Sequence, residues 1–513
     1  MGPQHPPQRP GLSPAHKRTQ CACETTGPPA RSGWVGLKFE VPAIRYFFML
    51  WVIVSGCGSN ADRRGSTVLF ASGADLQSIN PLLTAHPLAR QVQRYVLLTT
   101  LARYGSTMTV QPYLARFWEW SSDRRQLTMH LQSGLRWHDG RLTTGRDVAW
   151  TVNAARNAAT GYPRASELAT LDTIIASDDS TAVLRFNQSQ SRFPDVLTDL
   201  AILPAHHFEG VPYASLRRAS WNSAPVGNGP FRFVAHEPNR RWVFTANTEF
   251  PASLGGAPKL ERFIVVVVDE PTTKLAALTS GELDFAGIQP AHAEFVRRDS
   301  NLAVVSFPLL WTEGIVFNAR RAPFNRYEVR RRLSEAIDRQ ELVDGYIYGF
   351  GTPATGPVPP NAPGYVPVTL AAHTSREPMA PLRFELLTVG SGEAALEQML
   401  QARIRRAGFE VTIRQLELSA FLGRVYGATP DFEAAVLGIA GDPGLGYLQP
   451  LAGLAGFDAP SDPAAAQRMF ADSIPVAFLY HSRGLQGMNR RVRGVTMDLR
   501  GELPTVHDWW VTQ

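Results

Sequence analysis

The chain has 513 residues, of which 44% are hydrophobic and 19% are charged, a composition typical of a globular protein with room for two or more domains. The formal net charge of +6 is concentrated at the start, because residues 1–56 contain six Lys and Arg against two Glu. The remaining residues carry 45 basic against 43 acidic side chains. This balance excludes nucleic acid, or another polyanion, as the expected partner.

Residues 1–33 are rich in Pro, Gly and Arg ("MGPQHPPQRPGLSPAHKRTQCACETTGPPARSG"). Such a composition supplies too few apolar side chains for a packed core, so we expect no folded element there. The translation start is expected near Val35 or Val41. Residues 1–34 are then either a cleaved leader or no part of the protein.

The longest apolar run lies in "YFFMLWVIVSGCGSN" and contains eight consecutive apolar residues from Phe47. A bilayer span needs about 20 such residues, whereas the apolar region of a secretory signal needs only about 7–15. Arg45 precedes the run, and two small residues and Cys57 follow it. This arrangement resembles a bacterial lipobox, in which the Cys is acylated and becomes the first mature residue. The alternative is a buried Cys that ends a core strand.

Cysteine usage argues against both disulfides and a zinc site. Cys21 and Cys23 lie in the leader, so the mature chain would contain Cys57 alone and no internal disulfide is expected. A single Cys-x-Cys lacks the spacing of a zinc site. We predict no metal and no cofactor.

The sequence also argues against an enzyme. His138 and Asp139 are adjacent on a predicted turn and are poorly placed for a catalytic relay, and no Gly-x-Ser-x-Gly motif occurs. His206 and His207 lack a third ligand at helical spacing. A hydrolase is therefore not expected.

Alternating apolar residues predict strands at residues 66–72 and 126–132, the second with Leu127, Met129 and Leu131 on one side. A helix is predicted to follow. It begins at a capping box formed by Thr144 and Asp147 and continues through "VAWTVNAA", which starts at Val148.

The middle of the chain predicts a strand at 181–186 and another at 261–270, whose four consecutive Val residues favour burial on both faces. A helix that begins at Pro271 is expected to stop at Gly281, and a strand follows it.

The second half repeats the alternation of strand and helix. The proline-dense segment 349–365 is predicted to be a surface loop. Strands are expected at 314–319, 382–389, 410–418 and 431–441, and helices at 326–347 and 393–409. Strands that alternate with helices indicate α/β layers with mixed sheets.

From about Ser66 to the C-terminus, the order of motifs resembles the bacterial extracellular solute-binding proteins of the peptide/nickel class, family 5. The matching stretches are "LQSINP", "LARFWEWSSD", "LTMHLQSGLRWHDGRLTTGRDVAW", "PVGNGPFRF", "PKLERFIVVVV", "TTKLAALTSGELD", "APFNRYEVRRRLSEAIDRQELV" and "IPVAFLYHSR". None is diagnostic alone, but eight in the same order are a specific signal.

The resemblance implies an α/β, two-lobed periplasmic-binding-protein-like fold (type II, cluster C). Such a fold has mixed sheets, two hinge strands and an extra subdomain on the first lobe. The expected parts are a leader with a signal peptide at 1–56, a first lobe at 57–308 with the extra subdomain at about 100–220, a second lobe at 309–474, and a return to the first lobe at 475–513.

The resemblance also implies a function. The chain would be the substrate-binding lipoprotein of an ABC importer, which captures a peptide-like solute between its lobes and delivers it to a permease with its ATPase subunits. It would be an exported monomer, anchored by its lipid to a membrane, in the periplasm or at the cell surface. The alternatives are a receptor or chaperone lipoprotein of the same fold, or a binder of a nickel chelate or another small solute.

Several ligand contacts follow from the resemblance. Asp442, in "GIAGDPG", matches the Asp that pairs with the α-amine of a peptide, although it could be an ordinary turn residue. Trp150 matches an aromatic residue that faces the cleft, or it is a core Trp. Asp75 and Leu76 match a segment that hydrogen-bonds the main chain of the peptide, although Asp75 could equally occupy a turn. Trp311 would stack on the ligand.

The return strand and the aliphatic positions complete the predicted site. Phe478 and Tyr480 are two residues apart on a predicted strand, so we expect both on one face. Leu418 and Ile439 stand where peptide binders of the family often have Trp, and Val436 stands where a basic residue often occurs. The pocket is therefore expected to be aliphatic and poor at pairing with a ligand carboxylate.

One segment departs from the family pattern. Residues 454–473 are compressed relative to the longer helical segment usual in the family. The second lobe is therefore predicted to have lost a helix, which would affect closure or the surface that faces the permease.

Overall fold

The computed structural model describes residues 65–84, 86–368, 380–390, 392–427, 429–443, 445–460 and 462–512. All of them belong to one compact unit, Gly58–Gln513. Cys57 and the predicted signal and leader lie outside the described residues. No helix in the described ranges combines the length and apolarity needed to cross a bilayer.

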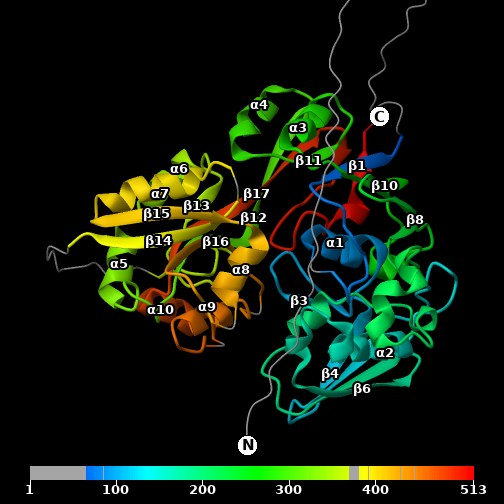
Figure 1. Ribbon diagram of the computed structural model, residues 1–513. Helices are drawn as coiled ribbons and strands as arrows, with labels where there is room; N and C mark the ends of the chain where they lie inside the picture. The colour runs from blue at the N-terminus through cyan, green and yellow to red at the C-terminus, as the bar shows by residue number, and fades with distance from the viewer. Residues whose placement is uncertain are drawn as a thin grey trace, which may run out of the picture. The chain divides into compact units, whose positions relative to one another are not determined.

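The main element of the fold is an eleven-stranded sheet (Figure 1). Its strands, in spatial order, are β15 (Phe409–Leu416), β14 (Leu382–Val389), β16 (Ala434–Ala440), β12 (Leu302–Phe317), β17 (Val476–Asn489), β11 (Phe285–Gly287), β1 (Thr67–Ser72), β10 (Arg262–Val267), β9 (Arg241–Ala246) and β8 (Phe231–Glu237), with β13 (Gly351–Pro353) paired to β17. Strand β14 runs parallel to β15 and β16, and β1 runs parallel to β10 and β11. The other pairs are antiparallel, so the predicted mixed sheet is confirmed.

The long strands β12 and β17 pair with each other and divide the sheet into a first half (β11, β1, β10, β9 and β8) and a second half (β15, β14 and β16). Both strands take part in core clusters on both halves. In β12, Leu302 and Phe307 pack with residues of the first half, whereas Ile315 and Phe317 pack with residues of the second half. The register of the pair shifts between Pro308 and Thr312. The predicted lobe boundaries at 308/309 and 474/475 fall within or beside these two strands and stay a prediction.

The second half of the sheet is buried on both faces, because neighbouring residues of one strand enter different clusters. Ile315 packs in one cluster and Val316 in the other. The first cluster receives side chains from α5 (Tyr327–Glu335), α6 (Arg339–Gly345) and α7 (Ala395–Arg405). The second receives them from α8 (Leu418–Tyr426), α9 (Leu448–Leu454) and α10 (Pro463–Ser473). In Figure 1, α7 and α8 accordingly lie on opposite faces of β14 and β16.

The first half adds a separate four-stranded antiparallel sheet, inside the range predicted for the extra subdomain. Its order is β4 (Ala115–Trp120), β5 (Gln126–Leu131), β7 (Thr181–Phe186) and β6 (Leu171–Asp178). Leu127, Met129 and Leu131 are buried on one side of β5, as predicted. The capping box of Thr144 and Asp147 is also present, at the start of α2 (Gly145–Arg156). Three further helices are α1 (Pro87–Val92), α3 (Pro271–Thr279) and α4 (Ala293–Arg298). Two short antiparallel strand pairs are β2 (Ala102–Tyr104) with β3 (Val110–Pro112), and β18 (Val492–Arg493) with β19 (Trp510–Val511).

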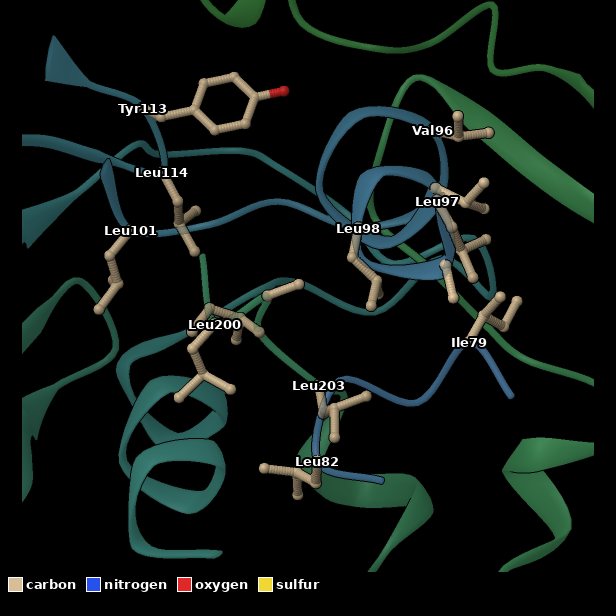
Figure 2. Close-up of a cluster of buried hydrophobic side chains, with 14 of the residues drawn as sticks. Ile79, Leu82, Val96, Leu97, Leu98, Leu101, Tyr113, Leu114, Leu200 and Leu203 are labelled. Atoms are coloured by element: carbon tan, nitrogen blue, oxygen red, sulfur yellow. The ribbon is translucent and has the colours of Figure 1, made fainter. Parts of the chain in front are cut away.

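Figure 2 shows how the core of the first half joins segments that are distant in sequence. Leu98, at the end of the turn after α1, belongs to one cluster with Leu114, Leu200 and Leu203. Each of these four leucines is at most 2% exposed. This packing ties α1 and the turn after it to the strands that follow.

Four details differ from the sequence-based expectations. The predicted helix at 326–347 is two helices, because Asp338 accepts a hydrogen bond from Glu341 N and begins α6 as a new helix. The predicted surface loop at 349–365 contains β13, and its Ala354 and Val358 are buried. In β10, only Phe263 and Val265 are fully buried, because the other face is partly exposed.

The fourth difference is the helix α8, which the strand predicted at 410–418 did not anticipate. Its first turn is capped by the Glu417 carboxylate, which accepts hydrogen bonds from Ser419 N and Ala420 N. The compressed segment at 454–473 forms α10 over its second half. The loss of a helix relative to the family stays a prediction.

Candidate functional site

A cavity of about 930 Å³ lies where the parallel strands β14 and β16 end. The chain leaves β14 through α7 on one face of the sheet, whereas it enters β16 after α8 on the opposite face. In α/β sheets, the carboxyl ends of strands at such a reversal form a crevice in which ligands bind. The volume lies in the range usual for a small-molecule or peptide site.

The cavity wall is mostly apolar and aromatic. It is formed by the start of α7, by α8, by the ends of β14 and β16, by the middle of β12, and by residues near Tyr346 and Tyr447. The lining residues are Trp311, Glu313, Tyr346, Thr388, Val389, Leu396, Glu397, Leu418, Phe421, Leu422, Tyr426, Val436, Leu437, Gly438, Ile439, Ala440, Tyr447, Pro450, Leu451 and Tyr480. No Lys, Arg or His occurs among them.

Two carboxylates, Glu313 and Glu397, line this otherwise apolar cavity. Trp311 Nε1 donates a hydrogen bond of 3.2 Å to Glu313, and Thr388 Oγ1 donates one to Glu397. Burial raises the pKa of Glu313 to about 7; the Trp311 hydrogen bond opposes this rise and the neighbouring Glu397 carboxylate adds to it. The cavity therefore has a negative character.

Two tyrosines face these carboxylates. The rings of Tyr346 and Tyr480 lie 6.4 Å apart, and burial raises the pKa of both, with both carboxylates adding to the rise. Tyr480 is only 4% exposed. Within the described residues its hydroxyl has no hydrogen-bond partner, although the residue lines the cavity. The oxygen itself is not fully buried, so it is accessible from the cavity and available to a ligand.

The cavity brings together five of the positions singled out from the sequence: Trp311, Leu418, Val436, Ile439 and Tyr480. Trp311 and Leu418 are 40% and 52% exposed, large values for such apolar side chains. The wall contains aliphatic side chains together with six aromatic ones. That this is the aliphatic pocket expected from the sequence, and that these residues contact a ligand, stay predictions.

The expectation that Phe478 and Tyr480 share a face is wrong. Phe478 packs against Phe470, with ring centroids 5.9 Å apart, and belongs to the cluster beneath α9 and α10. Tyr480 belongs to the opposite cluster and to the cavity. The register of β12 and β17 shifts here, with Glu313 opposite Tyr480 and Gly314 opposite Phe478. The extra residue of this bulge reverses the alternation.

Asp442 follows the end of β16, two residues beyond Ala440 of the cavity wall. It is partly exposed, and its carboxylate has no hydrogen-bond partner within the described residues. Burial raises the pKa of Tyr447, a cavity residue, and the charge of Asp442 adds to this rise. Asp442 therefore lies near the cavity without lining it, and its pairing with an α-amine stays a prediction.

The carboxylate of Asp75 is engaged within the protein. It accepts hydrogen bonds from Trp242 Nε1 at 2.8 Å and Asn239 N at 2.7 Å, and it lies 3.2 Å from His236 Nε2. Burial alone would raise its pKa, but these contacts lower it to about 2. Leu76 is completely buried. Only the main chain of these two residues remains for the predicted peptide contact.

Trp150 lines a different hollow, of about 610 Å³, on the first half of the chain. Its ring stacks on Phe208 with centroids 4.6 Å apart, and Tyr213 lies at 6.2 Å. Trp150 is thus packed against other aromatic rings of the core. None of the other predicted ligand residues lines this hollow.

His206 lines the same hollow and corrects one premise of the sequence interpretation. Asp139 lies 2.7 Å from His206 Nε2 and 3.2 Å from His207 Nε2, so a third possible metal ligand is present although it is distant in sequence. These contacts also join the turn at Asp139 to the short 3-10 helix before Phe208.

Glu313 and Glu397 were not identified from the sequence. Glu313 follows Thr312 in a strand, and Glu397 occupies the first turn of α7, where an acidic residue is common for helix-dipole reasons alone. Nothing in the local pattern indicates that the two meet. A charged residue inside a run of strand-forming apolar residues was the only available signal.

Another cavity, of about 980 Å³, lies beside Gly65, where the described chain begins. It is formed by turns around Ser280, Asn301 and Arg490. None of the predicted ligand residues lines it. We therefore assign the candidate site to the cavity at β14 and β16.

Comparisons with known proteins agree on one family. The profile described as "Bacterial extracellular solute-binding proteins, family 5 Middle" matches residues 109–458. The di/tripeptide-binding protein 4 of Pseudomonas aeruginosa is 26% identical over 386 residues, which cover 67% of this chain and 70% of that protein. The chain spans about half the length of the first curated relatives it matches, from Brucella, at 29% identity over 242 residues and 45% of their length.

Solved structures with the same fold span two kinds of ligand. The oligopeptide-binding protein AppA from Bacillus subtilis, in complex with a nonapeptide, has a TM-score of 0.71 at 20% identity and covers 88% of this chain and 99% of its own. NikZ from Campylobacter jejuni, in complex with Ni(L-His), has a TM-score of 0.69 at 17% identity and covers 87% and 99%. The expected two-lobed, cluster C binding-protein fold is thereby confirmed.

Proposed function

Because this chain belongs to family 5 of the bacterial extracellular solute-binding proteins, we propose that it captures a peptide-type solute and delivers it to an ABC importer. The family is one of solute-binding proteins and not of enzymes. The observation that carries the proposal is the 930 Å³ cavity at the ends of β14 and β16, in which Trp311, Leu418 and Tyr480 meet.

The cavity supports a peptide over a nickel complex as the solute. A transition-metal chelate would be held best by imidazole or sulfur ligands from the protein. The twenty lining residues include no His, Cys or Met. They do include exposed Trp and Leu side chains, which suit the side chains of a short peptide.

Binding is proposed to close the two lobes on the solute, with residues 57–308 and 475–513 as one lobe and residues 309–474 as the other. Asp442, at the end of β16, would pair with the α-ammonium of the peptide, because a carboxylate and an ammonium form a strong, charge-assisted hydrogen bond. The pair would lose its water on closure, so it would chiefly determine specificity.

The test of this arrangement is the variant Asp442→Asn, which keeps the size and one acceptor but removes the charge. Loss of one partner of a buried charge pair costs about 2–5 kcal/mol, so the dissociation constant of a free tripeptide should rise about 30-fold or more. N-acetylated tripeptide should bind the natural protein weakly and lose little more on the variant. Calorimetric titration of both peptides against both proteins gives the four values.

Non-additivity is the decisive feature of that experiment, because general destabilisation would weaken both peptides alike. Equal affinity of the natural protein for the free and the acetylated peptide would remove Asp442 from the site. If neither form binds, the peptide proposal itself fails.

Cys57 is proposed to carry a lipid that anchors the exported protein near its permease. One acyl chain binds a membrane only marginally, so several chains would be needed. Palmitate labelling in cells that express Cys57→Ala checks this: the label should disappear, and labelling equal to that of the natural protein would contradict the anchor.

A further inference from the structure

The cavity has a chemical bias that the family assignment does not specify. Two carboxylates, Glu313 and Glu397, line a wall to which the described part of the chain contributes no basic side chain. Tyr480 adds a hydroxyl on a side chain that is 96% buried and has no partner among the described residues. Six aromatic residues also line the cavity: Trp311, Tyr346, Phe421, Tyr426, Tyr447 and Tyr480.

We propose that this cavity recognises a cationic side chain of the solute, the ammonium of lysine or the guanidinium of arginine, through Glu313, Glu397 and the hydroxyl of Tyr480. The inference rests on the proposed function and specifies its substrate class. A buried carboxylate is costly without a counter-charge, and no cationic side chain of the described residues lines the cavity. The aliphatic stem of lysine or arginine suits the Leu and Val wall, and its charge suits the carboxylates and aromatic rings.

The positions of the two carboxylates are fixed by elements on either side of the cavity. Glu313 lies on β12 and keeps its orientation through Trp311 Nε1, while Glu397 lies on α7 and accepts from Thr388 at the end of β14. Each carboxylate retains further acceptor positions beyond these single hydrogen bonds. An ammonium with three N–H donors could therefore use both carboxylates and Tyr480 together.

The same geometry predicts a pH dependence. Glu313, with its pKa raised to about 7 by burial, is mostly neutral at pH 6 and mostly ionised at pH 8. A cation prefers the ionised form, so affinity for a lysine peptide should rise with pH. The other groups that face Glu313 are Glu397 on α7, Tyr346 beyond α6 and Tyr480 on β17. Burial raises the pKa of both tyrosines, which stay neutral in this range.

The experiment titrates the full chain by calorimetry with Lys-Ala-Ala, Ala-Lys-Ala and Ala-Ala-Lys, their three glutamate counterparts, and Ala-Ala-Ala. At pH 8 the best lysine peptide should bind about 30-fold more tightly than its glutamate counterpart. Glu313→Gln and Glu397→Gln should each reduce this preference about tenfold. Glu393→Gln, an exposed position four residues before Glu397, is the matched control and should leave the preference unchanged.

A pH series on the natural protein needs no substitution and stands even if a Gln variant fails to fold. The ratio of lysine-peptide to Ala-Ala-Ala affinity should rise about tenfold between pH 6 and pH 8, because about a tenth of Glu313 is ionised at the lower pH and about nine tenths at the higher. Ala-Ala-Ala corrects for titration of the α-amine.

The outcomes separate this inference from the proposed function. If Ala-Ala-Ala binds but lysine and glutamate peptides bind equally, or the ratio is flat with pH, the cationic subsite is wrong and the peptide-binding function stands. If none of the seven peptides binds, both are wrong.

Discussion

At the scale of single residues, the motif "VGNGP" at 226–230 packs closely against Leu97. It needs the side chain of Asn228 and the absence of one at Gly227. Leu97 O accepts hydrogen bonds from Asn228 N at 3.1 Å and Gly229 N at 2.8 Å. The completely buried Asn228 side chain also accepts from Thr99 N. These hydrogen bonds hold the turn that ends at Leu98 (Figure 2) against the segment just before β8.

Gly227→Ala should destabilise the protein, because a Cβ at this position would lie 2.0 Å from Leu97 O and 2.8 Å from the Leu97 side chain. The backbone must move to relieve this contact, and overpacking of this kind costs about 1–3 kcal/mol. Thermal and urea unfolding measure the loss. The control Gly453→Ala, in α9 with nothing within 4 Å of the added atom, should be neutral or slightly stabilising. Equal stability of the two variants would contradict the close approach.

At the scale of secondary-structure elements, the pairing of β12 and β16 shapes the cavity wall. Glu313 is opposite Gly438 in this antiparallel pair, and the indole of Trp311, two residues earlier on β12, lies over the same glycine. Because Gly438 has no side chain, the ring can approach the backbone of β16 closely. The position of Trp311 therefore depends on a residue of the neighbouring strand.

Gly438→Ala should weaken peptide binding without unfolding the protein. The added Cβ would lie 2.0 Å from Trp311 Cζ2, so the indole must move within the cavity and away from Glu313. We expect an affinity loss of about tenfold, or about 1.4 kcal/mol, together with a shift in tryptophan fluorescence. Gly423→Ala on α8, where the added atom meets nothing within 4 Å, is the control. Unchanged affinity in Gly438→Ala would show that Trp311 does not contact the solute.

Elements governed by local signals were predictable from the sequence, and features that depend on a partner strand were not. The Thr144 capping box and the buried face of β5 follow from neighbouring residues alone. The bulge that separates Phe478 from Tyr480 arises from pairing with β12 and leaves no local pattern. The meeting of Glu313 with Glu397 likewise requires the tertiary arrangement, so the apolar wall of the site was predictable and its charge was not.

At the scale of the whole molecule, β12 and β17 are the structural basis for the proposed movement of the lobes. Both strands contribute buried residues to the clusters of the second half of the sheet. Toward the first half, β12 contributes the buried Leu302 and Phe307, and β17 contributes the partly buried Met488. Their register shifts beside Trp311 and Tyr480, so the cavity adjoins the place where the strand pair is irregular. Bending there would move α7 and α8, and the cavity they line, relative to the first half.

Photo-crosslinking tests whether the chain binds a peptide-type solute in the cavity at β14 and β16. A lysine-containing tripeptide with one p-benzoylphenylalanine is irradiated with the full chain, and the attachment sites are mapped by mass spectrometry. Labels are expected on cavity residues such as Trp311, Leu418 and Tyr426, and an excess of unlabelled tripeptide should remove them. Competed labelling confined to the hollow around Trp150 and His206, or no competed labelling at all, would contradict binding in this cavity.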